Sequence, residues 1–178
     1  LEEDVFPPDQ KIDCHGLIYL GNRIFNCHKK TGHGPLDLRH GLAESCNVYF
    51  WTVGRQYLGV DRIVDFATQF GLGQATGIDL PSETFGLVPT PQQKEETYNA
   101  KWVGGDTMNI SIGQGDLLIT PLQMANMMAM VVNRGTIYRP RLLKETRDPI
   151  SGEVADRIAP QVLHQSTINT AVFDELQD

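Results

Sequence analysis

Apolar residues recur at helical spacing on both sides of the polar triplet Ser45-Cys46-Asn47. They are Leu36, Leu38 and Leu42 before it, and Val48, Phe50, Val53 and Leu58 after it. This spacing predicts two helices that meet at the triplet. One interpretation is that the Ser or the Asn is simply a helix cap, with no catalytic role. The alternative is a catalytic Ser-x-Asn element, and the triplet alone does not decide between them.

The same periodicity predicts helices downstream at 61–70 and, beyond a short polar helix expected at 91–98, at 120–132. Asp61 is the expected cap of the first, which ends at the glycines of 71–73. Thr120 and Pro121 give the third a cap and a first-turn proline. We expect the four methionines of that helix to lie mostly in the core. Apolar spacing over 160–177 predicts a final helix.

Strand and turn signals occupy the remaining segments. Residues 14–35 are rich in Gly and Pro and predict a long loop with one hairpin around 17–25. Glycine pairs at both ends of 102–115 favour a short buried strand or turn. Residues 136–158 predict two or three short strands. We therefore expect a mainly α chain with a small β element.

Composition narrows the function classes. The 178 residues are 40% hydrophobic, which is enough for one domain or a large piece of one. The net charge of −7 and the absence of a basic stripe argue against a nucleic-acid partner. No apolar run is long enough to span a bilayer. The chain starts at Leu1 inside an acidic stretch, so we expect an excised or processed segment of a longer protein.

All three cysteines lie in the first 46 residues, together with four of the five histidines. Cys14, Cys27, His33 and Cys46 follow the spacing C-x12-C-x5-H-x12-C. Thiolate and imidazole are the ligands that a tetrahedral zinc site prefers, and four of them close a structural site. Because an odd number of cysteines cannot fully pair within a chain, zinc fits better than a disulfide framework.

Two alternatives to this ligand set stay open. His15 and His28 each directly follow a cysteine and compete as ligands, although neighbouring residues bind one ion awkwardly. The three thiols can also be unrelated core residues with surface histidines nearby. A zinc ion at Cys46 would tie the long loop to the Ser-Cys-Asn triplet.

Lys30-Thr31-Gly32 also lies in this loop. A Lys-Thr-Gly triplet is one of the three elements of serine acyl-transfer enzymes of the penicillin-recognising type. In those enzymes it follows the Ser-x-Asn element and lies on a strand. Here it precedes Ser45 and sits among glycines, so we interpret it as a chance match.

Eight segments, taken in order, resemble the transpeptidase domain of class B penicillin-binding proteins, most closely the elongation-type penicillin-binding protein 2. They are 28–34, 43–50, 70–73, 76–81, 86–90, 105–109, 111–115 and 120–125. Each segment is weak alone, but their shared order is specific. The resemblance runs from about Cys14 to Leu143 and implies the helical subdomain of the β-lactamase-like serine transpeptidase fold.

The resemblance implies an acyl-enzyme mechanism. In the family a Ser of an upstream Ser-x-x-Lys attacks the D-Ala-D-Ala carbonyl of a peptidoglycan stem peptide, and β-lactams acylate the same nucleophile. Ser45 matches the residue that relays a proton to the leaving amine. Asn47 matches the residue that hydrogen-bonds the Lys and the substrate amide. The resemblance also implies a zinc site with ligands at His33 and Cys46. Two further family ligand positions, both Asp, fall near Cys14 and at Cys27, and a Cys in place of Asp keeps a good zinc ligand.

The resemblance further implies that the parent protein lies at the periplasmic face of the bacterial inner membrane. It also implies a partner, a membrane glycosyltransferase of the elongation machinery. The expected organisation is a partial transpeptidase domain over 1–178. Its parts are the zinc loop and Ser-x-Asn region (14–46), a helical core (36–133), short strands (136–158) and a C-terminal helix (160–177).

Two family elements are missing from the chain. No Ser is followed by Lys three residues on, and no Lys-Thr-Gly follows Ser45. We therefore expect the chain alone to be inactive and not to bind penicillin covalently. The alternatives are a zinc-stabilised binding module without chemistry, and a related β-lactam-recognising serine hydrolase or sensor.

Overall fold

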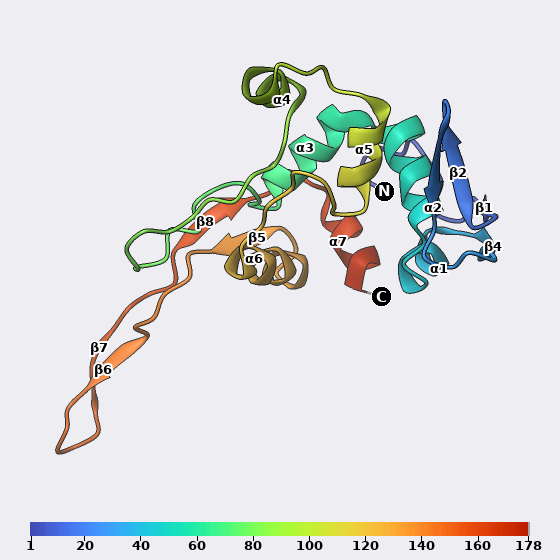
Figure 1. Ribbon diagram of the computed structural model, residues 1–178. Helices are drawn as coiled ribbons and strands as arrows, with labels where there is room; N and C mark the ends of the chain where they lie inside the picture. Colours follow the sequence, from blue (N-terminus) through green and yellow to red (C-terminus); the bar gives the residue numbers. More distant parts are fainter. Residues whose placement is uncertain (178) are drawn as a thin grey trace. The chain divides into compact units, whose positions relative to one another are not determined.

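The computed structural model describes residues 1–177 (Figure 1). These residues form two compact units. The first unit comprises 1–66 and 88–117, and the second comprises 67–87 and the chain from 118 onward. No sequence pattern marks this division, because the boundary falls inside a continuous helix. The expected helical core of 36–133 is thus shared between the two units.

The first unit begins with two small antiparallel pairs. Strand β1 (Ile12–Cys14) pairs with β4 (Gly34–Leu36), and β2 (Leu17–Leu20) pairs with β3 (Arg23–Asn26). The second pair confirms the hairpin expected around 17–25. A side chain at Gly16 would collide with the carbonyl of Lys30, so glycine is required where these two backbone segments touch.

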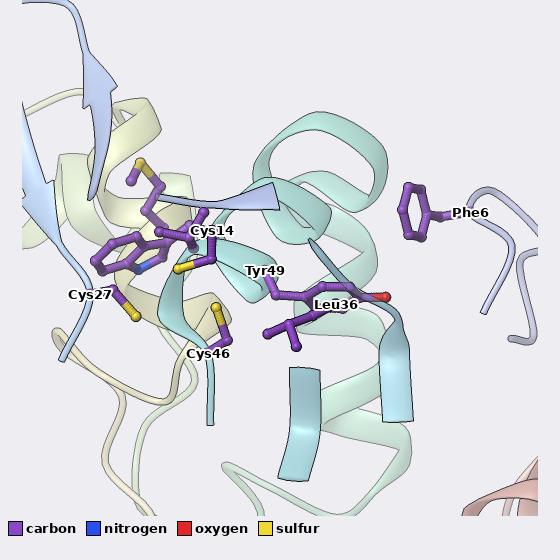
Figure 2. Packing of buried hydrophobic residues seen from close by; sticks show 9 residues of the cluster. Phe6, Cys14, Cys27, Leu36, Cys46 and Tyr49 are labelled. Atoms are coloured by element: carbon purple, nitrogen blue, oxygen red, sulfur yellow. The ribbon is translucent and has the colours of Figure 1, made fainter. Parts of the chain in front are cut away.

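Four helical segments follow without a long loop. They are α1 (Leu38–Ala43), α2 (Asn47–Thr52), the π-helix η1 (Val53–Leu58) and α3 (Gly59–Gln69). The junction between α1 and α2 confirms the two helices predicted to meet at Ser45-Cys46-Asn47. Asp61 lies in the first turn of α3 and does not precede it as a cap. The core beneath α2 contains Tyr49, Trp51 and Met108 beside the three cysteines (Figure 2).

The first unit ends with α4 (Pro91–Tyr98), as predicted, and α5 (Gly104–Ser111). The strand or turn expected over 102–115 is wrong. The Asp106 carboxylate accepts the N–H of Val103 at 2.8 Å, and Trp102 Nε1 donates to Thr107 Oγ1 at 2.8 Å. These side-chain bonds stabilise a helical first turn and outweigh the glycine pair that suggested a tight turn.

The second unit is built around α6 (Pro121–Val132), which contacts β5 (Thr136–Tyr138). Thr120 caps α6 as predicted, and Gln123 completes a capping box. The expectation that the methionines are mostly core is only partly met, because Met130 is fully buried whereas Met124 and Met128 are exposed.

The C-terminal helix predicted over 160–177 is wrong in its first half. Residues Val162–Gln165 form β8, which pairs antiparallel with β5, and only Thr170–Gln177 form a helix, α7. Pairing with β5 overrides the helical spacing of the apolar residues. Strands β6 (Glu145–Arg147) and β7 (Val154–Arg157) form a second pair, which Figure 1 shows as a protruding hairpin.

Residues 1–177 thus contain eight helical segments and eight short strands in four two-stranded sheets. Strands are more widespread than the single small β element expected. Within the described residues, no helix is both long and apolar enough to cross a membrane.

Candidate metal centre and Ser-x-Asn turn

The turn that carries Ser45 is a Schellman motif at the end of α1. The N–H of Ser45 donates to the carbonyl of Leu42 at 3.0 Å, and the N–H of Cys46 donates to that of Gly41 at 2.9 Å. Ser45 occupies the left-handed position of the motif, with a φ of 50°. Glycine is the usual residue there, since a side chain in this conformation costs about 1–2 kcal/mol. The serine is exposed, so its hydroxyl is presented to solvent at a strained position.

The next residues start α2. Cys46 is the N-cap residue and makes no side-chain capping bond, and Asn47 is the first helical residue. The N–H groups of Asn47 and Val48, in the first turn of α2, instead donate to the sulfur of Cys27. The capping role that sequence alone left open for Ser45 or Asn47 therefore belongs to Cys27, a residue from the preceding loop.

The structure brings the four predicted ligand residues together. One ligand atom from each of Cys14, Cys27, His33 and Cys46 lies within 4.8 Å of the others. His33 Nδ1 is 3.4 Å from Cys14 Sγ and 3.7 Å from Cys27 Sγ. A tetrahedral ion with bonds of about 2.0–2.3 Å separates its ligands by about 3.5–3.8 Å, so the two distances from His33 are close to those around a single metal. Figure 2 shows the three sulfur atoms pointing toward one another.

The imidazole of His33 is poised to act as a neutral ligand. Its side chain is 1% exposed, and burial lowers its pKa, with further lowering from the charges of Lys29 and His28. Nδ1 faces the thiols, whereas the buried Nε2 has no hydrogen-bond partner among the described residues. The Glu44 carboxylate lies 3.9 Å from Nε2, where it favours a proton on that nitrogen and leaves Nδ1 free to bind.

The thiols differ in acidity. Burial raises the pKa of Cys46 to about 12, and the neighbouring sulfur of Cys14 adds to the effect. Burial also acts to raise the pKa of Cys27, but backbone N–H groups of Lys29, Val48 and Asn47 outweigh it and lower that pKa. A thiolate is therefore stabilised at Cys27 by the protein itself, whereas Cys46 needs a cation to lose its proton.

The competing histidines lie outside the four-residue group. His28 is exposed, its ring packs at a tilt of 59° against that of His33 with centroids 5.0 Å apart, and its Nδ1 is 3.8 Å from Cys27 Sγ. His15 is exposed. Lys30 and Thr31 form a turn and not a strand, in agreement with their interpretation as a chance match. Sequence analysis missed Glu44 and the capping role of Cys27, for which no local pattern exists.

The chain belongs to the family of penicillin-binding protein transpeptidase domains, whose model matches residues 1–178. Among curated proteins it is 43% identical to the peptidoglycan D,D-transpeptidase MrdA of Acinetobacter baumannii over 122 residues, which cover 68% of this chain and 18% of that protein. It is 37% identical to the MrdA of Haemophilus influenzae over 170 residues, covering 94% of this chain and 25% of that one. The chain thus spans about a fifth to a quarter of the length of these relatives.

A solved structure gives the same result for the fold. The chain superposes on penicillin-binding protein 2 of Helicobacter pylori, determined in complex with MreC, with a TM-score of 0.79 and 27% identity over 97% of this chain and 29% of that one. These matches confirm the resemblance to the class B, penicillin-binding protein 2 type.

Proposed function

We propose that this chain supplies the Ser-x-Asn element of a peptidoglycan D,D-transpeptidase that cross-links stem peptides through an acyl-serine intermediate. One observation carries the proposal. Ser45 keeps a strained, exposed conformation at a position where glycine is the stable choice, within a chain that matches the transpeptidase family along its length. A serine retained for capping alone would gain nothing from that strain.

In this proposal Ser45 and Asn47 assist a nucleophile from another segment. The Ser45 hydroxyl relays a proton to the leaving amine, and the Asn47 carboxamide binds the lysine of a Ser-x-x-Lys element and the substrate amide. Both residues flank Cys46, whose backbone belongs to the turn and whose side chain points into the cluster. The positions of Ser45 and Asn47 relative to each other therefore depend on the turn and on the cluster that hold Cys46.

Zinc is the proposed occupant of the Cys14, Cys27, His33 and Cys46 cluster. Three thiolates and one imidazole make a closed, four-ligand set, which is typical of structural zinc and leaves no position for substrate. When bound, the ion would supply charge neutralisation for the thiolates and a cross-link between the 14–36 loop and α2. It would take no part in acyl transfer.

The chain by itself is proposed to be inactive. It contains neither a Ser-x-x-Lys nor a Lys-Thr-Gly C-terminal to Ser45, so the nucleophile and the group that binds the substrate carboxylate come from outside these residues. The proposed fold is the mainly helical subdomain of the transpeptidase, which packs against a larger sheet. A 178-residue sample should remain unlabelled by a fluorescent penicillin.

The proposed partners follow from the same assignment. They are peptidoglycan stem peptides as substrates, β-lactams as inhibitors, and a membrane glycosyltransferase of the elongation machinery. The Helicobacter pylori relative was solved in complex with MreC, which supports assembly with a further protein. The proposed location is the periplasmic face of the inner membrane.

The test is acylation of the complete protein by a fluorescent penicillin and cross-linking of a stem peptide. Ser45→Ala should slow both reactions by about 10²–10⁴-fold, the usual contribution of a positioned proton donor or acceptor. Ser151→Ala, on the exposed turn between β6 and β7, is the matched control and should change neither rate. Unchanged rates in a folded Ser45→Ala protein would remove the proposed role of Ser45.

A further inference from the structure

The cluster contains three free thiols, and this number has a chemical consequence beyond metal binding. Cys14, Cys27 and Cys46 are all buried and unpaired, and their sulfur atoms lie within 4.8 Å of one another. Disulfide bonding requires two sulfurs to approach to about 2 Å, and each sulfur in this cluster already has another sulfur nearby. Since three thiols cannot all pair, one must remain free.

Cys14 and Cys27 belong to the same small β-structured segment. The N–H of Cys27 donates to the carbonyl of Gly16 at 2.8 Å, and the carbonyl of Cys14 accepts the N–H of His33 at 2.9 Å. Cys14 is also the last residue of β1, paired with Gly34. Backbone bonds thus place both cysteines in one small β-structured region that precedes α1.

Cys46 is placed by different contacts. Its N–H donates to Gly41 at the end of α1, and its carbonyl accepts the N–H of Phe50 in α2. It is 0% exposed, whereas Cys14 and Cys27 are each 2% exposed. Cys46 is thus the most enclosed of the three thiols and lies between two helices, so a dissolved oxidant reaches it least.

From this arrangement we infer that Cys14 and Cys27 form an intrachain disulfide when no metal ion holds them, and that Cys46 is left as a buried thiol. The inference concerns the metal-free state of the proposed zinc site and does not depend on transpeptidase activity. Disulfide and metal are mutually exclusive, because the bond consumes two of the four ligands. Oxidation would therefore remove the metal-mediated cross-link between the 14–36 loop and Cys46, and the Ser45 turn would lose that support.

The oxidant in this step is a small-molecule disulfide such as oxidised glutathione. The Cys27 thiolate attacks one glutathione sulfur, forms a mixed disulfide and expels one glutathione thiolate. The Cys14 thiolate then attacks Cys27 Sγ and expels the second. Two protein thiols are oxidised to one disulfide, and one glutathione disulfide is reduced to two thiols, with the two protons going to the leaving thiolates.

Peptide mapping tests the pairing directly, because trypsin separates the three cysteines into peptides 12–23, 24–29 and 40–55. The purified protein is stripped of metal under reduction, freed of reductant, incubated with oxidised glutathione and alkylated in denaturant. The expected product links 12–23 to 24–29, lacks two hydrogen atoms, and carries one alkylated cysteine in 40–55. Three alkylated cysteines, or a link that includes 40–55, would overturn the inference.

Two controls separate this result from the zinc proposal. A sample reloaded with zinc, its metal content measured, should stay unlinked under the same oxidant. Cys46→Ser should still form the 12–23 to 24–29 link, and loss of the link in a variant with an unchanged circular dichroism spectrum would contradict the pairing. Failure to bind zinc would leave the disulfide test intact, because the test uses metal-free protein.

Discussion

The sulfur of Cys27 accepts a hydrogen bond from the backbone N–H of Asn47, although the two residues lie 20 positions apart and in different elements. A ligand of the proposed metal is therefore also the cap of the helix that begins with the proposed catalytic asparagine. Cys46 adds a second connection, because it lies between Ser45 and Asn47 and turns its sulfur into the same cluster. The cluster thus holds the Ser-x-Asn turn from both sides.

Replacing Ser45 with glycine should change stability and catalysis in opposite directions, making the protein more stable and less active. Glycine adopts a φ of 50° without steric cost, so Ser45→Gly should raise the free energy of unfolding by about 1 kcal/mol and raise the Tm with it. The same change removes the hydroxyl and should abolish the contribution of Ser45 to acylation by penicillin. Thermal melts and acylation rates of the complete protein check the two effects.

The matched control is Ser45→Ala, which keeps the left-handed strain and also removes the hydroxyl. Its Tm should not rise, whereas its acylation rate should fall as in the glycine variant. Equal melting temperatures for the two variants would contradict the strain at this position.

Gly54 in η1 lies against Ser111 in α5, and this contact leaves no room for a side chain. A Cβ at residue 54 would lie 2.6 Å from the Cβ of Ser111. Gly54→Ala should therefore lower the free energy of unfolding by about 1–3 kcal/mol, as measured by urea denaturation. Gly105→Ala is the control, since its nearest atom is 3.6 Å away, and a comparable loss there would argue against a specific contact.

Gln123 joins three segments of the second unit through one buried amide. Nε2 donates to the carbonyls of Gln74 and Phe85 at 2.7 Å each, and Oε1 accepts the N–H of Thr120 at 2.9 Å. Gln123→Met keeps the volume but leaves these groups unpaired, so it should destabilise the protein by about 3 kcal/mol in a urea titration. Gln92→Met on the exposed face of α4 should cost less than about 0.5 kcal/mol.

Glu83 gives the second unit a defined pH dependence. Its carboxylate accepts hydrogen bonds from the hydroxyl and N–H of Thr76 and the N–H of Gly77, and the Thr76 hydroxyl is the main cause of its pKa falling below 4.5. A lowered pKa means that the folded state binds fewer protons, so this contribution is present above pH 4.5 and is lost as pH falls through the folded pKa.

Amide hydrogen exchange at Thr76 and Gly77 measures this effect. After correction for the intrinsic pH dependence of exchange, protection of both amides should fall at acid pH in the wild type. In Glu83→Gln it should be low and independent of pH. A wild-type profile as flat as that of the variant would show that the carboxylate does not hold this segment.

The four candidate metal ligands could be predicted because few residue types bind zinc. Cys and His can therefore be picked out even when they are spread over 33 residues. The Ser45 turn was not predictable in detail, since Ser carries no signal for the left-handed conformation that glycine marks. Helix α5 was missed because its stabilising contacts come from the side chains of Asp106 and Thr107, which outweigh the glycines at its start. Strand β8 was missed because its pairing with β5 is a tertiary contact that periodicity does not record.

Metal analysis of the purified protein tests the central claim, that a metal-bound cluster holds the Ser45–Asn47 turn. The account predicts one zinc per chain, with an X-ray absorption spectrum that fits three sulfur ligands and one nitrogen ligand. Chelation should lower the Tm, because zinc at a hundred times its Kd stabilises a folded state by about 2.7 kcal/mol. A folded, metal-free protein whose three thiols react freely, with a Tm that a chelator does not change, would contradict the claim.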